Sequence, residues 1–532
     1  MHFRIPLMPN KPIVNIADSV QILKLCLAAS IVCLPLGGSA GSAARLSIKA
    51  TISVSKELQS KVKPNGRFLI YLNPSKSAGK PPVYGDTEFM LAGNIRNWNT
   101  AKEAVIDSSD REVRTLGFDL NGGKEYANHY QCILRYKQDN DGTEVFQPVC
   151  FTGQIDSVVL AAKTAFRVTL DKEVPPTRVI TNKFVQEFTL KSRLLSSFQG
   201  KPYYLSAAVL LPSGYWDHPE KKYPVLYLVP GLNGRHDQVN SFSQNPEFFN
   251  WWLGPEGPQV VNVFLDSKGP YGDCYQMNSE NNGPFGDALT QELMPYIESQ
   301  CRGYGIPKYR FLDGASTGGW VVLALQIFYP DYFNGAWSYS PDPVDFERFG
   351  LIDIYRDKSV YDNRFDYLQP KSRTIYGEPK YSMKDAIQGE NMQGPSNTYA
   401  TSGRQFGAYN AVFSPKGKDG LPELMFDPVT GRIDRAVAEK WKRWDLKRYL
   451  ESNWQTVGPR LQGKLWIWCG DMDDLYSNVA LRPFQKFIES TQNPRSDAQI
   501  SFTPMAGHCA AFSHKDVLMK VAEKVSRLAG DN

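Results

Sequence analysis

The segment Gly314-Ala315-Ser316-Thr317-Gly318 has the spacing Gly-x-Ser-x-Gly, which is typical of a nucleophile elbow. In such an elbow the serine lies on a tight turn between a strand and a helix, and its hydroxyl is exposed. The two glycines lack a Cβ, so the turn can close and the helix can approach the strand. We therefore expect Ser316 to be a nucleophile held in a strained backbone. A glycine-rich turn with a solvent-exposed serine is the simpler alternative.

A serine hydroxyl is a good nucleophile only when a neighbouring base takes its proton and a third group orients that base. In sheets that carry this elbow, the partners follow in the order serine, acid, histidine. His508 and His514 are the two histidines that follow Ser316 in the sequence. His508 comes directly after a predicted strand and is the expected base. His514 opens the last predicted helix and is interpreted as a capping or surface residue.

The expected acid lies in Gly470-Asp471-Met472-Asp473-Asp474, a loop directly after a predicted strand. Repulsion disfavours an arrangement in which all three carboxylates point inward. The Gly-x-x-Asp spacing favours Asp473, and Asp474 is the second choice. Asp342 and Asp345 are weaker alternatives, and any of these aspartates could instead cap a helix or a turn.

The negative charge that develops on a carbonyl oxygen needs backbone N–H donors. One expected donor is Thr317, the residue after the nucleophile, and the other comes from a loop after an earlier strand. The candidate loop is Val229-Pro230-Gly231-Leu232-Asn233-Gly234. We expect the N–H of Leu232 to be this donor, with that of Asn233 as the alternative. An ordinary glycine-rich connection would have the same composition.

The elements that must position these residues alternate between apolar strands and helices. Strands buried on both faces are expected at 225–229 and 260–265, and further strands at 309–312, 336–340, 465–469 and 500–503. Helices are expected at 287–302, 320–328 and 515–528. A hairpin of 184–190 and 203–211 precedes them. This alternation predicts an α/β domain over residues 184–532, with a mostly parallel sheet and helices on both faces. Pro295 is a candidate kink in the first helix.

Residues 341–463 show no clear strand rhythm and are interpreted as an insertion. The stretch from Gly389 to Gly407 is expected to be loop, and the stretch from Ile433 to Trp454 is expected to be helical. An insertion at this point predicts a lid or cap over the C-terminal edge of the sheet, where sheets of this kind bind ligands.

Residues 45–183 contain short strands separated by turn residues, for example 46–54 and 67–72. No long helical period interrupts them. This pattern predicts a β-sandwich accessory domain ahead of the α/β domain. Its aromatic residues Trp98, Tyr126 and Tyr130 are expected in the core rather than on a ligand-binding surface.

The N-terminal stretch 1–44 has the features of a secretory signal peptide. Lys24 precedes the apolar run 25–36, and small residues follow at 37–44, where cleavage is expected after Ala40 or Ala44. The apolar run is shorter than a membrane-spanning helix requires, so we expect a secreted or periplasmic protein that leaves the membrane after cleavage. A buried helix or an uncleaved anchor is the alternative.

Six cysteines lie beyond this stretch, and an exported protein permits disulfides. Cys132 and Cys150 flank a turn-like segment, so a disulfide across a hairpin is expected there. No cluster of cysteine and histidine has metal-ligand spacing, and we expect neither a metal nor a cofactor.

The net charge of +5 is spread along the chain, which does not indicate nucleic-acid binding. A mean hydropathy of −0.39 excludes a polytopic membrane protein.

Several segments together resemble the putative esterase family of α/β-hydrolases, which includes enterochelin esterases, feruloyl and acetylxylan esterases, esterase D and the mycolyltransferases. The resemblance covers about 184–530 and rests on Tyr223-Pro224-Val225-Leu226-Tyr227, Pro230-Gly231-Leu232, Gly283-Pro284-Phe285-Gly286-Asp287, Glu292-Leu293-Met294-Pro295-Tyr296-Ile297-Glu298, Gly314-Ala315-Ser316-Thr317-Gly318-Gly319, Gly470-Asp471-Met472-Asp473 and Gly507-His508. It implies an α/β-hydrolase fold with Ser316, Asp473 and His508 as nucleophile, acid and base. A β-rich domain ahead of the hydrolase domain is similar to the enterochelin-esterase layout.

The chain departs from this family at two places. Pro230 stands where many members have histidine before the glycine, which affects local hydrogen bonding more than the backbone donors. The second departure is the long insertion after Ser340, so the resemblance to the family implies no particular substrate. Cys509 beside His508 is similar to the His-Cys pair of tannase-like esterases, but Ala315 stands where those enzymes place a cysteine, so we infer no tannase.

These observations lead to the expectation of a secreted serine esterase that acts on a small-molecule or sugar-linked ester through an acyl-enzyme. Its activity should fall as the pH drops through the titration of the histidine, near 6.5 if that pKa is unperturbed. An acyltransferase of the same fold and a hydrolase-like module that only binds are the alternative hypotheses.

Overall fold

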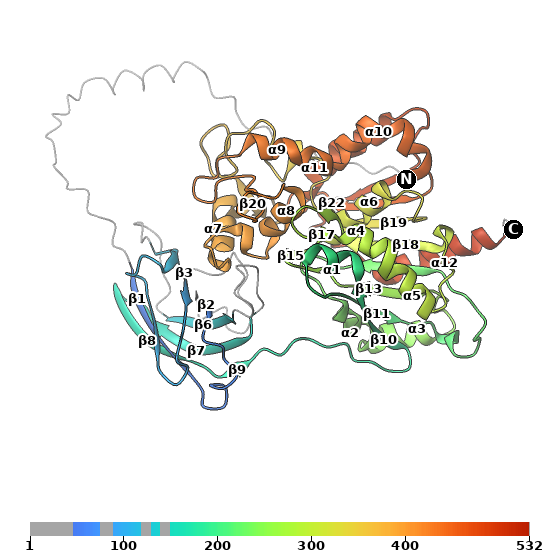
Figure 1. The fold of residues 1–532 in the computed structure, drawn as a ribbon. Helices are drawn as coiled ribbons and strands as arrows, with labels where there is room; N and C mark the ends of the chain where they lie inside the picture. The colour runs from blue at the N-terminus through green and yellow to red at the C-terminus, as the bar shows by residue number, and fades with distance from the viewer. Residues whose placement is uncertain (1–45, 75–88, 119–128, 139–148, 531–532) are drawn as a thin grey trace, which may run out of the picture. The chain divides into compact units, whose positions relative to one another are not determined.

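The computed structural model describes residues 46–74, 89–118, 129–138 and 149–530. The expected signal peptide at 1–44 lies outside the described residues. The strands of the main sheet are β10 (Val185–Ser192), β11 (Tyr203–Leu210), β12 (Val225–Val229), β13 (Val261–Leu265), β18 (Arg310–Ala315), β19 (Ala336–Tyr339), β22 (Leu465–Gly470) and β23 (Gln499–Thr503). Every strand predicted between 184 and 503 is therefore present (Figure 1).

The strands of this sheet lie in the order β10-β11-β13-β12-β18-β19-β22-β23, which reads 1-2-4-3-5-6-7-8 when they are numbered along the chain. β11 is antiparallel to both of its neighbours, and the remaining pairs are parallel. This order and these directions are those of the α/β-hydrolase fold. The fold predicted for this part of the chain is confirmed.

The sheet has a core on each face because alternate side chains of a strand point to opposite sides. In β12, Val225, Tyr227 and Val229 belong to one buried cluster, whereas Leu226 and Leu228 belong to the other. The first cluster includes side chains from α1 (Arg193–Gln199), α4 (Phe285–Ala288), α5 (Met294–Gln300), α6 (Thr317–Phe328), α10 (Leu446–Leu461) and α11 (Ser477–Ser490), as well as from helices of the insertion described below. Those of the second are α2 (Val239–Ser243), α3 (Pro246–Leu253) and α12 (His514–Gly530). Helices on both faces explain why these strands are continuously apolar.

The helix predicted at 287–302 is present but irregular. It consists of α4, a π-helical segment η6 (Leu289–Leu293) and α5. Pro295 lies in the first turn of α5 and has no N–H to donate to the preceding turn. A wide π turn directly before this residue accommodates the missing hydrogen bond.

The segment predicted to be an insertion contains regular elements that the sequence did not suggest. They are the hairpin of β20 (Pro370–Arg373) and β21 (Pro379–Ser382), and the helices α7 (Met383–Gln393) and α8 (Gln405–Phe413). A third helix, α9 (Arg435–Trp441), falls within the stretch that was predicted to be helical. The loop expected from Gly389 to Gly407 is wrong at both ends, because α7 and α8 extend into it. A capping box of Ser382 and Asp385 begins α7, and it satisfies N–H groups that a short helix would otherwise leave unpaired.

The helix expected from Ile433 to Trp454 is broken near its middle. Asp445 lies between α9 and α10, and its carboxylate accepts a hydrogen bond from the N–H of Arg448, so it caps a new helix. That helix continues past the expected end to Leu461. α11 was not predicted at all.

Two smaller sheets precede the main sheet in the chain. Their strands are β1 (Ser47–Val54), β2 (Gly66–Pro74), β3 (Phe89–Ile95), β4 (Ala104–Asp107), β5 (Arg114–Leu116), β6 (His129–Gln138), β7 (Phe151–Val159), β8 (Lys163–Leu170) and β9 (Lys172–Glu173). Six of them pair in the order β5-β3-β2-β6-β7-β9, and three pair as β4-β1-β8. One buried cluster takes side chains from both sheets, and it includes Trp98 and Tyr130 as expected. Tyr126 lies outside the described residues.

The disulfide expected between Cys132 and Cys150 is not formed. Cys132 pairs with Ile155 in the ladder of β6 and β7, whereas the N–H of Cys150 bonds to the carbonyl of Tyr136, four residues further along β6. Four residues of strand span about 13 Å, and a disulfide needs Cα atoms within about 7 Å. The spacing in the sequence did not reveal this offset.

None of the helices in the described ranges combines the length and the apolar character that crossing a membrane requires.

Candidate active site

Ser316 lies between β18 and α6 with a backbone that L-residues rarely adopt. Its φ is 58° and its ψ is −126°, a conformation that costs about 1–3 kcal/mol and persists only where the surroundings impose it. A Cβ added at Gly314 would lie 2.4 Å from the carbonyl oxygen of Gly318, and one added at Gly318 would lie 2.2 Å from that of Val229. Both glycines are therefore required for the elbow to close, which is the steric role predicted from the sequence.

The hydroxyl of Ser316 makes no hydrogen bond with any residue that the structure describes, and the residue is half-buried. Its backbone N–H donates to the carbonyl of Tyr339 at the end of β19, at 2.9 Å. The hydroxyl of this candidate nucleophile is thus positioned by the backbone alone, without a side-chain partner in the described chain.

His508 and Asp473 form a hydrogen bond of 2.8 Å between Nδ1 and Oδ2. The Asp473 side chain is completely buried, and its other oxygen accepts hydrogen bonds from the N–H groups of Leu475 and Ser477. The Nε2 atom of His508 is buried and has no partner among the described residues. With Nδ1 donating to the carboxylate, Nε2 carries the lone pair that a general base needs.

The charges of this pair depend on each other. Burial lowers the pKa of His508, but the hydrogen bonds to Asp473 and Cys509 and the charge of Asp473 outweigh burial, so this pKa is raised above its ordinary value. Burial raises the pKa of Asp473, but the hydrogen bond and charge of His508 hold it below its usual range. The carboxylate therefore stays ionised and favours the imidazolium that proton transfer would create.

The end of β19 connects the elbow to the histidine loop. The carbonyl of Tyr339 that accepts the N–H of Ser316 also lies 3.8 Å from the Sγ atom of Cys509. The next residue, Ser340, accepts the N–H of Cys509 on its Oγ atom at 3.0 Å. Tyr339 and Ser340 thus hold both segments next to each other, and no motif in the sequence indicated this role.

The three aspartates of the acid loop point in different directions. Asp473 binds the ring of His508, whereas Oδ1 of Asp474 accepts the backbone N–H of His508 at 2.9 Å. Asp471 forms an ion pair with Arg482. The second choice for the acid, Asp474, therefore contacts the histidine without touching its ring.

The weaker alternatives for the acid do not contact His508. Asp342 accepts hydrogen bonds from the hydroxyls of Thr317 and Tyr275, both at 2.8 Å, and from the amide of Gln405 at 3.1 Å. Asp345 caps the short helix η8 (Phe346–Arg348) by accepting the N–H of Glu347. Asp342 instead holds the side chain of the residue that follows the nucleophile.

The loop expected to donate to the oxyanion lies beside the elbow. A Cβ added at Gly231 would lie 4.0 Å from the Cβ of Ser316. The N–H of Asn233 donates to Oδ2 of the buried Asp273 at 2.7 Å and is therefore engaged. The N–H of Leu232 makes no hydrogen bond within the described chain, and Thr317 is the first residue of α6, where a helix leaves its N–H groups free.

His514 is buried, so its interpretation as a capping or surface residue is wrong. Its Nδ1 atom lies 2.5 Å from Oδ2 of Asp313, and its Nε2 atom lies 2.6 Å from the side-chain amide of Asn262. Both ring nitrogens are therefore occupied within the core between the sheet and α12. The apolar neighbours that bury it come from segments far away in the sequence, which the local pattern could not show.

In the described chain, no group of three or more His, Cys, Asp or Glu side chains is arranged to hold a metal ion.

Residues 204–515 match a family model named Esterase, described as putative esterase. The match spans more than half of the chain and contains Ser316, Asp473 and His508. The chain belongs to the putative esterase family. This places it among the serine carboxylic ester hydrolases with an α/β-hydrolase fold.

Solved structures with similarity to this family member include other esterases. A ferulic acid esterase is 16% identical with a TM-score of 0.39, over 64% of this chain and 96% of that protein. An S-formylglutathione hydrolase from Agrobacterium tumefaciens is 14% identical with a TM-score of 0.37, over 65% and 99%. A fluorophosphonate-binding serine hydrolase F from Staphylococcus aureus is 13% identical with a TM-score of 0.37, over 64% and 98%.

A curated relative, an uncharacterized protein from Corynebacterium glutamicum, is 24% identical over 143 residues. The matched segment is 25% of this chain and spans 32% of the length of that relative, about a third.

Proposed function

We propose that this protein is an exported serine esterase that cleaves a carboxylic ester through an acyl-enzyme, with Ser316 as nucleophile, His508 as base and Asp473 as acid. The observation that carries the proposal is the buried hydrogen bond between Asp473 and His508, which leaves Nε2 without a partner. Tyr339 and Ser340 hold this histidine loop beside the elbow of Ser316.

In the first half of the reaction, Oγ of Ser316 attacks the ester carbonyl carbon and its proton passes to Nε2 of His508. The buried carboxylate of Asp473 stabilises the imidazolium that forms. The N–H groups of Leu232 and Thr317 donate to the oxyanion, and each such donor typically contributes about 2.7–4 kcal/mol at the transition state. His508 then gives the proton to the leaving alcohol, and the acyl group remains on Ser316.

In the second half, His508 takes a proton from water, and the resulting hydroxide attacks the acyl carbon. The tetrahedral intermediate collapses, Ser316 regains its proton from His508, and the carboxylic acid leaves. The same acyl-enzyme would pass its acyl group to an alcohol if one reached the site before water.

Three further parts of the proposal concern the rest of the chain. Residues 1–44 direct export and are then removed, so the mature protein is secreted or periplasmic. Residues 45–183 form a β-sandwich accessory domain, which is supported by two sheets that share one buried cluster. The insertion 341–463 acts as a lid, which is supported by the hydrogen bonds of its Arg373 to the acid loop and of its Asp342 to Thr317.

Labelling with a fluorophosphonate, followed by intact mass measurement, tests the nucleophile. The wild type should gain a single adduct, and Ser316→Ala should gain none and lose at least about 10⁴-fold in kcat for an ester that the wild type cleaves. Thr317→Ser, which keeps the backbone donor, is the matched control and should retain the adduct. No adduct and no ester cleavage by the wild type would refute the proposal. Product analysis with an added alcohol separates hydrolysis from acyl transfer.

A further inference from the structure

The acid loop that carries Asp473 has an irregular backbone. With the two residues after it, it connects β22, which ends at Gly470, to α11, which begins at Ser477. Tyr476 lies in this connection with a φ of 66° and a ψ of 22°, in the left-handed region that favours glycine. Such a conformation persists only where the surrounding structure imposes it. Contacts from outside the loop are therefore expected to fix its shape.

Arg373 of β20 contacts this loop from the insertion, 100 residues earlier in the chain than Asp473. Its Nε atom donates to the carbonyl of Asp473 at 3.0 Å. Its Nη2 atom donates to the carbonyl of Asp471 at 3.3 Å and to Oδ1 of Asn478 at 3.1 Å. Its own backbone N–H donates to the carbonyl of Asp474 at 3.0 Å. One residue of the insertion thus binds three carbonyl groups of the acid loop.

The shape of the guanidinium group matters for this contact. Its Nε and Nη2 atoms lie on one edge of a rigid plane, so they hold the carbonyl oxygens of Asp473 and Asp471 at a fixed separation. The same plane lies over the ring of Tyr476, with 4.7 Å between Cζ of Arg373 and the ring centre. A lysine has a single charged group on a flexible chain and could not reproduce this fork.

The side-chain partners of Arg373 are neutral groups, and within the described chain it forms no ion pair. Arg482 of α11 differs in this respect, because it binds the same loop through the carboxylate of Asp471. An arginine that only balances a surface charge would bind in the second way. Arg373 instead binds the backbone, so its contacts determine the path of the loop.

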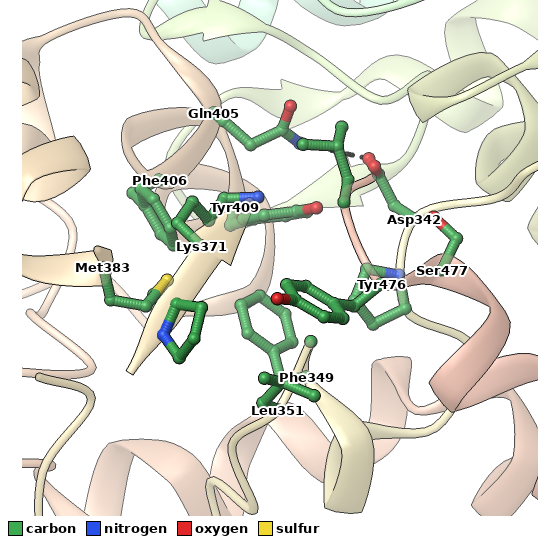
Figure 2. A pocket seen from close by; sticks show the side chains of 14 residues that line it. Asp342, Phe349, Leu351, Lys371, Met383, Gln405, Phe406, Tyr409, Tyr476 and Ser477 are labelled. Carbon is green, nitrogen blue, oxygen red and sulfur yellow. Dashed lines mark hydrogen bonds between the residues drawn. The ribbon is translucent and has the colours of Figure 1, made fainter. Parts of the chain in front are cut away.

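The hairpin and the loop do not pack against each other over their whole length. A pocket lies beside the contact, and Lys371 of β20 lines it together with Tyr476 and Ser477 (Figure 2). Side chains of the two segments face this pocket instead of filling the space between them. The hydrogen bonds of Arg373 therefore contribute more to the contact than they would in a continuously packed interface.

The backbone that Arg373 holds belongs to the residue that orients the catalytic histidine. Oδ2 of Asp473 lies 2.8 Å from Nδ1 of His508, and a hydrogen bond weakens steeply when its geometry is disturbed. A displacement of about 1 Å at a catalytic group can lower the rate by about 10²-fold. A shift of the Asp473 backbone would be passed directly to this hydrogen bond.

We propose that Arg373 is a positioning residue for the reaction, which binds the backbone of the acid loop and thereby keeps the carboxylate of Asp473 aligned with Nδ1 of His508. This inference rests on the proposed esterase function. Arg373 forms no hydrogen bond with His508 or Ser316 in the described chain, so it acts through Asp473. The hairpin of the insertion is accordingly a fixed part of the catalytic site.

Substitution of Arg373 tests this inference on a 4-nitrophenyl ester that the wild type cleaves. Arg373→Ala should lower kcat by about 10- to 100-fold and leave KM within about threefold, because the group that is lost orients the base and does not touch the substrate. Arg373→Lys keeps the positive charge but not the fork, and it should still lose about tenfold in kcat.

The pH dependence of kcat/KM separates positioning from the loss of a charge. Burial lowers the pKa of His508, and the hydrogen bonds and charge around it, first of all the bond to Asp473, outweigh burial. A loosened bond should therefore move the midpoint of the pH profile down in both variants. Removal of a nearby cation alone would favour the imidazolium and move the midpoint up in Arg373→Ala. A smaller folded fraction alone would lower the rate at every pH and leave the midpoint unchanged.

The matched control is Arg482→Ala, which removes an arginine that binds the side chain of Asp471 and not the backbone of the loop. It should keep kcat within about threefold and the midpoint unchanged. The inference is overturned if Arg373→Ala loses no more kcat than Arg482→Ala, or if its midpoint stays or rises, and the esterase function then still stands. Absence of both fluorophosphonate labelling and ester cleavage in the wild type would instead remove the function itself. If Arg373→Ala does not fold, Arg373→Lys decides, and a wild-type kcat and midpoint in that variant overturn the inference.

Discussion

Two aspartate–histidine pairs in the described chain have a fully buried carboxylate, one at the C-terminal edge of the sheet and one at the start of α12. In the first, Asp473 binds His508, whose side chain is 16% exposed and whose Nε2 atom has no partner. In the second, Asp313 binds His514, whose side chain is 2% exposed and whose Nε2 atom accepts the amide of Asn262. The carboxylate is fully buried in both pairs.

The comparison shows that an aspartate–histidine bond does not by itself create a base. A base needs a second ring nitrogen with a free lone pair and an opening through which a reacting proton arrives. His508 has both, whereas both nitrogens of His514 are used to satisfy a buried core. We therefore expect the first pair to govern catalysis and the second to govern stability.

The largest expected effect separates the two histidines by activity. His508→Ala removes the base and should lower kcat by at least about 10⁴-fold. Its cost in stability should be smaller than that of His514→Ala, because two backbone N–H groups still bind the carboxylate of Asp473. The measurement is ester hydrolysis alongside a thermal unfolding curve. His514→Ala is the matched substitution and should leave kcat/KM of the folded fraction within about threefold. A loss from His514→Ala as large as that from His508→Ala would invert the assignment.

The next effect separates the pairs by stability. His514→Ala leaves the buried carboxylate of Asp313 without its partner, and burial already raises the pKa of that carboxyl. Removal of one member of a buried pair typically costs about 3–5 kcal/mol of unfolding free energy. The thermal midpoint of the α/β part should fall by about 5–10 °C, measured by calorimetry. An unchanged midpoint would show that the second pair contributes no stability.

A third prediction concerns the pH at which the catalytic pair works. Nε2 of His508 acts as a base only when it is unprotonated, and the raised pKa of His508 keeps the proton bound to a higher pH. kcat/KM should therefore rise with pH through a midpoint above 6.5, rather than near 6.5 as an unperturbed histidine would give. Asp473→Asn removes the charge that raises this pKa and leaves burial, which lowers it, so the midpoint of the residual activity should move down. A wild-type midpoint at or below 6.5 would contradict this assignment.

The sequence predicted those parts of the site that depend on local patterns. The Gly-x-Ser-x-Gly spacing identified the elbow because the steric need for Gly314 and Gly318 is local. The apolar strands predicted the sheet because burial on both faces leaves a continuous apolar run. The placement of Asp473 and His508 followed from their positions after predicted strands.

The remaining parts depend on contacts between distant segments and left no local pattern. Ser340 binds the backbone of Cys509, 169 residues later, and Asp313 binds His514, 201 residues later. The insertion begins with a long stretch that contains only the short helix η8 before β20, and nearly every residue of α8 is buried, so its fold could not be inferred from a local pattern. Local sequence patterns therefore identify reactive groups more readily than the groups that surround them.

The smallest expected effect concerns Asp474, which contacts the backbone of His508 and not its imidazole ring. Asp474 accepts the backbone N–H of His508 and fixes the loop that carries it, while Asp473 orients the imidazole. Asp474→Ala removes one charge-assisted hydrogen bond, worth about 1.5–3 kcal/mol where it is fully formed, and should lower kcat by about tenfold with KM nearly unchanged. Asp474→Asn keeps an acceptor oxygen and should recover most of the rate.

The control is Asp471→Ala on the same loop as Asp474. This substitution breaks the ion pair of Asp471 with Arg482 of α11, but Asp471 touches neither the ring nor the backbone of His508. If Asp471→Ala slowed the enzyme as much as Asp474→Ala, general disturbance of the loop would explain both, and the bond to the histidine backbone would have no separate role.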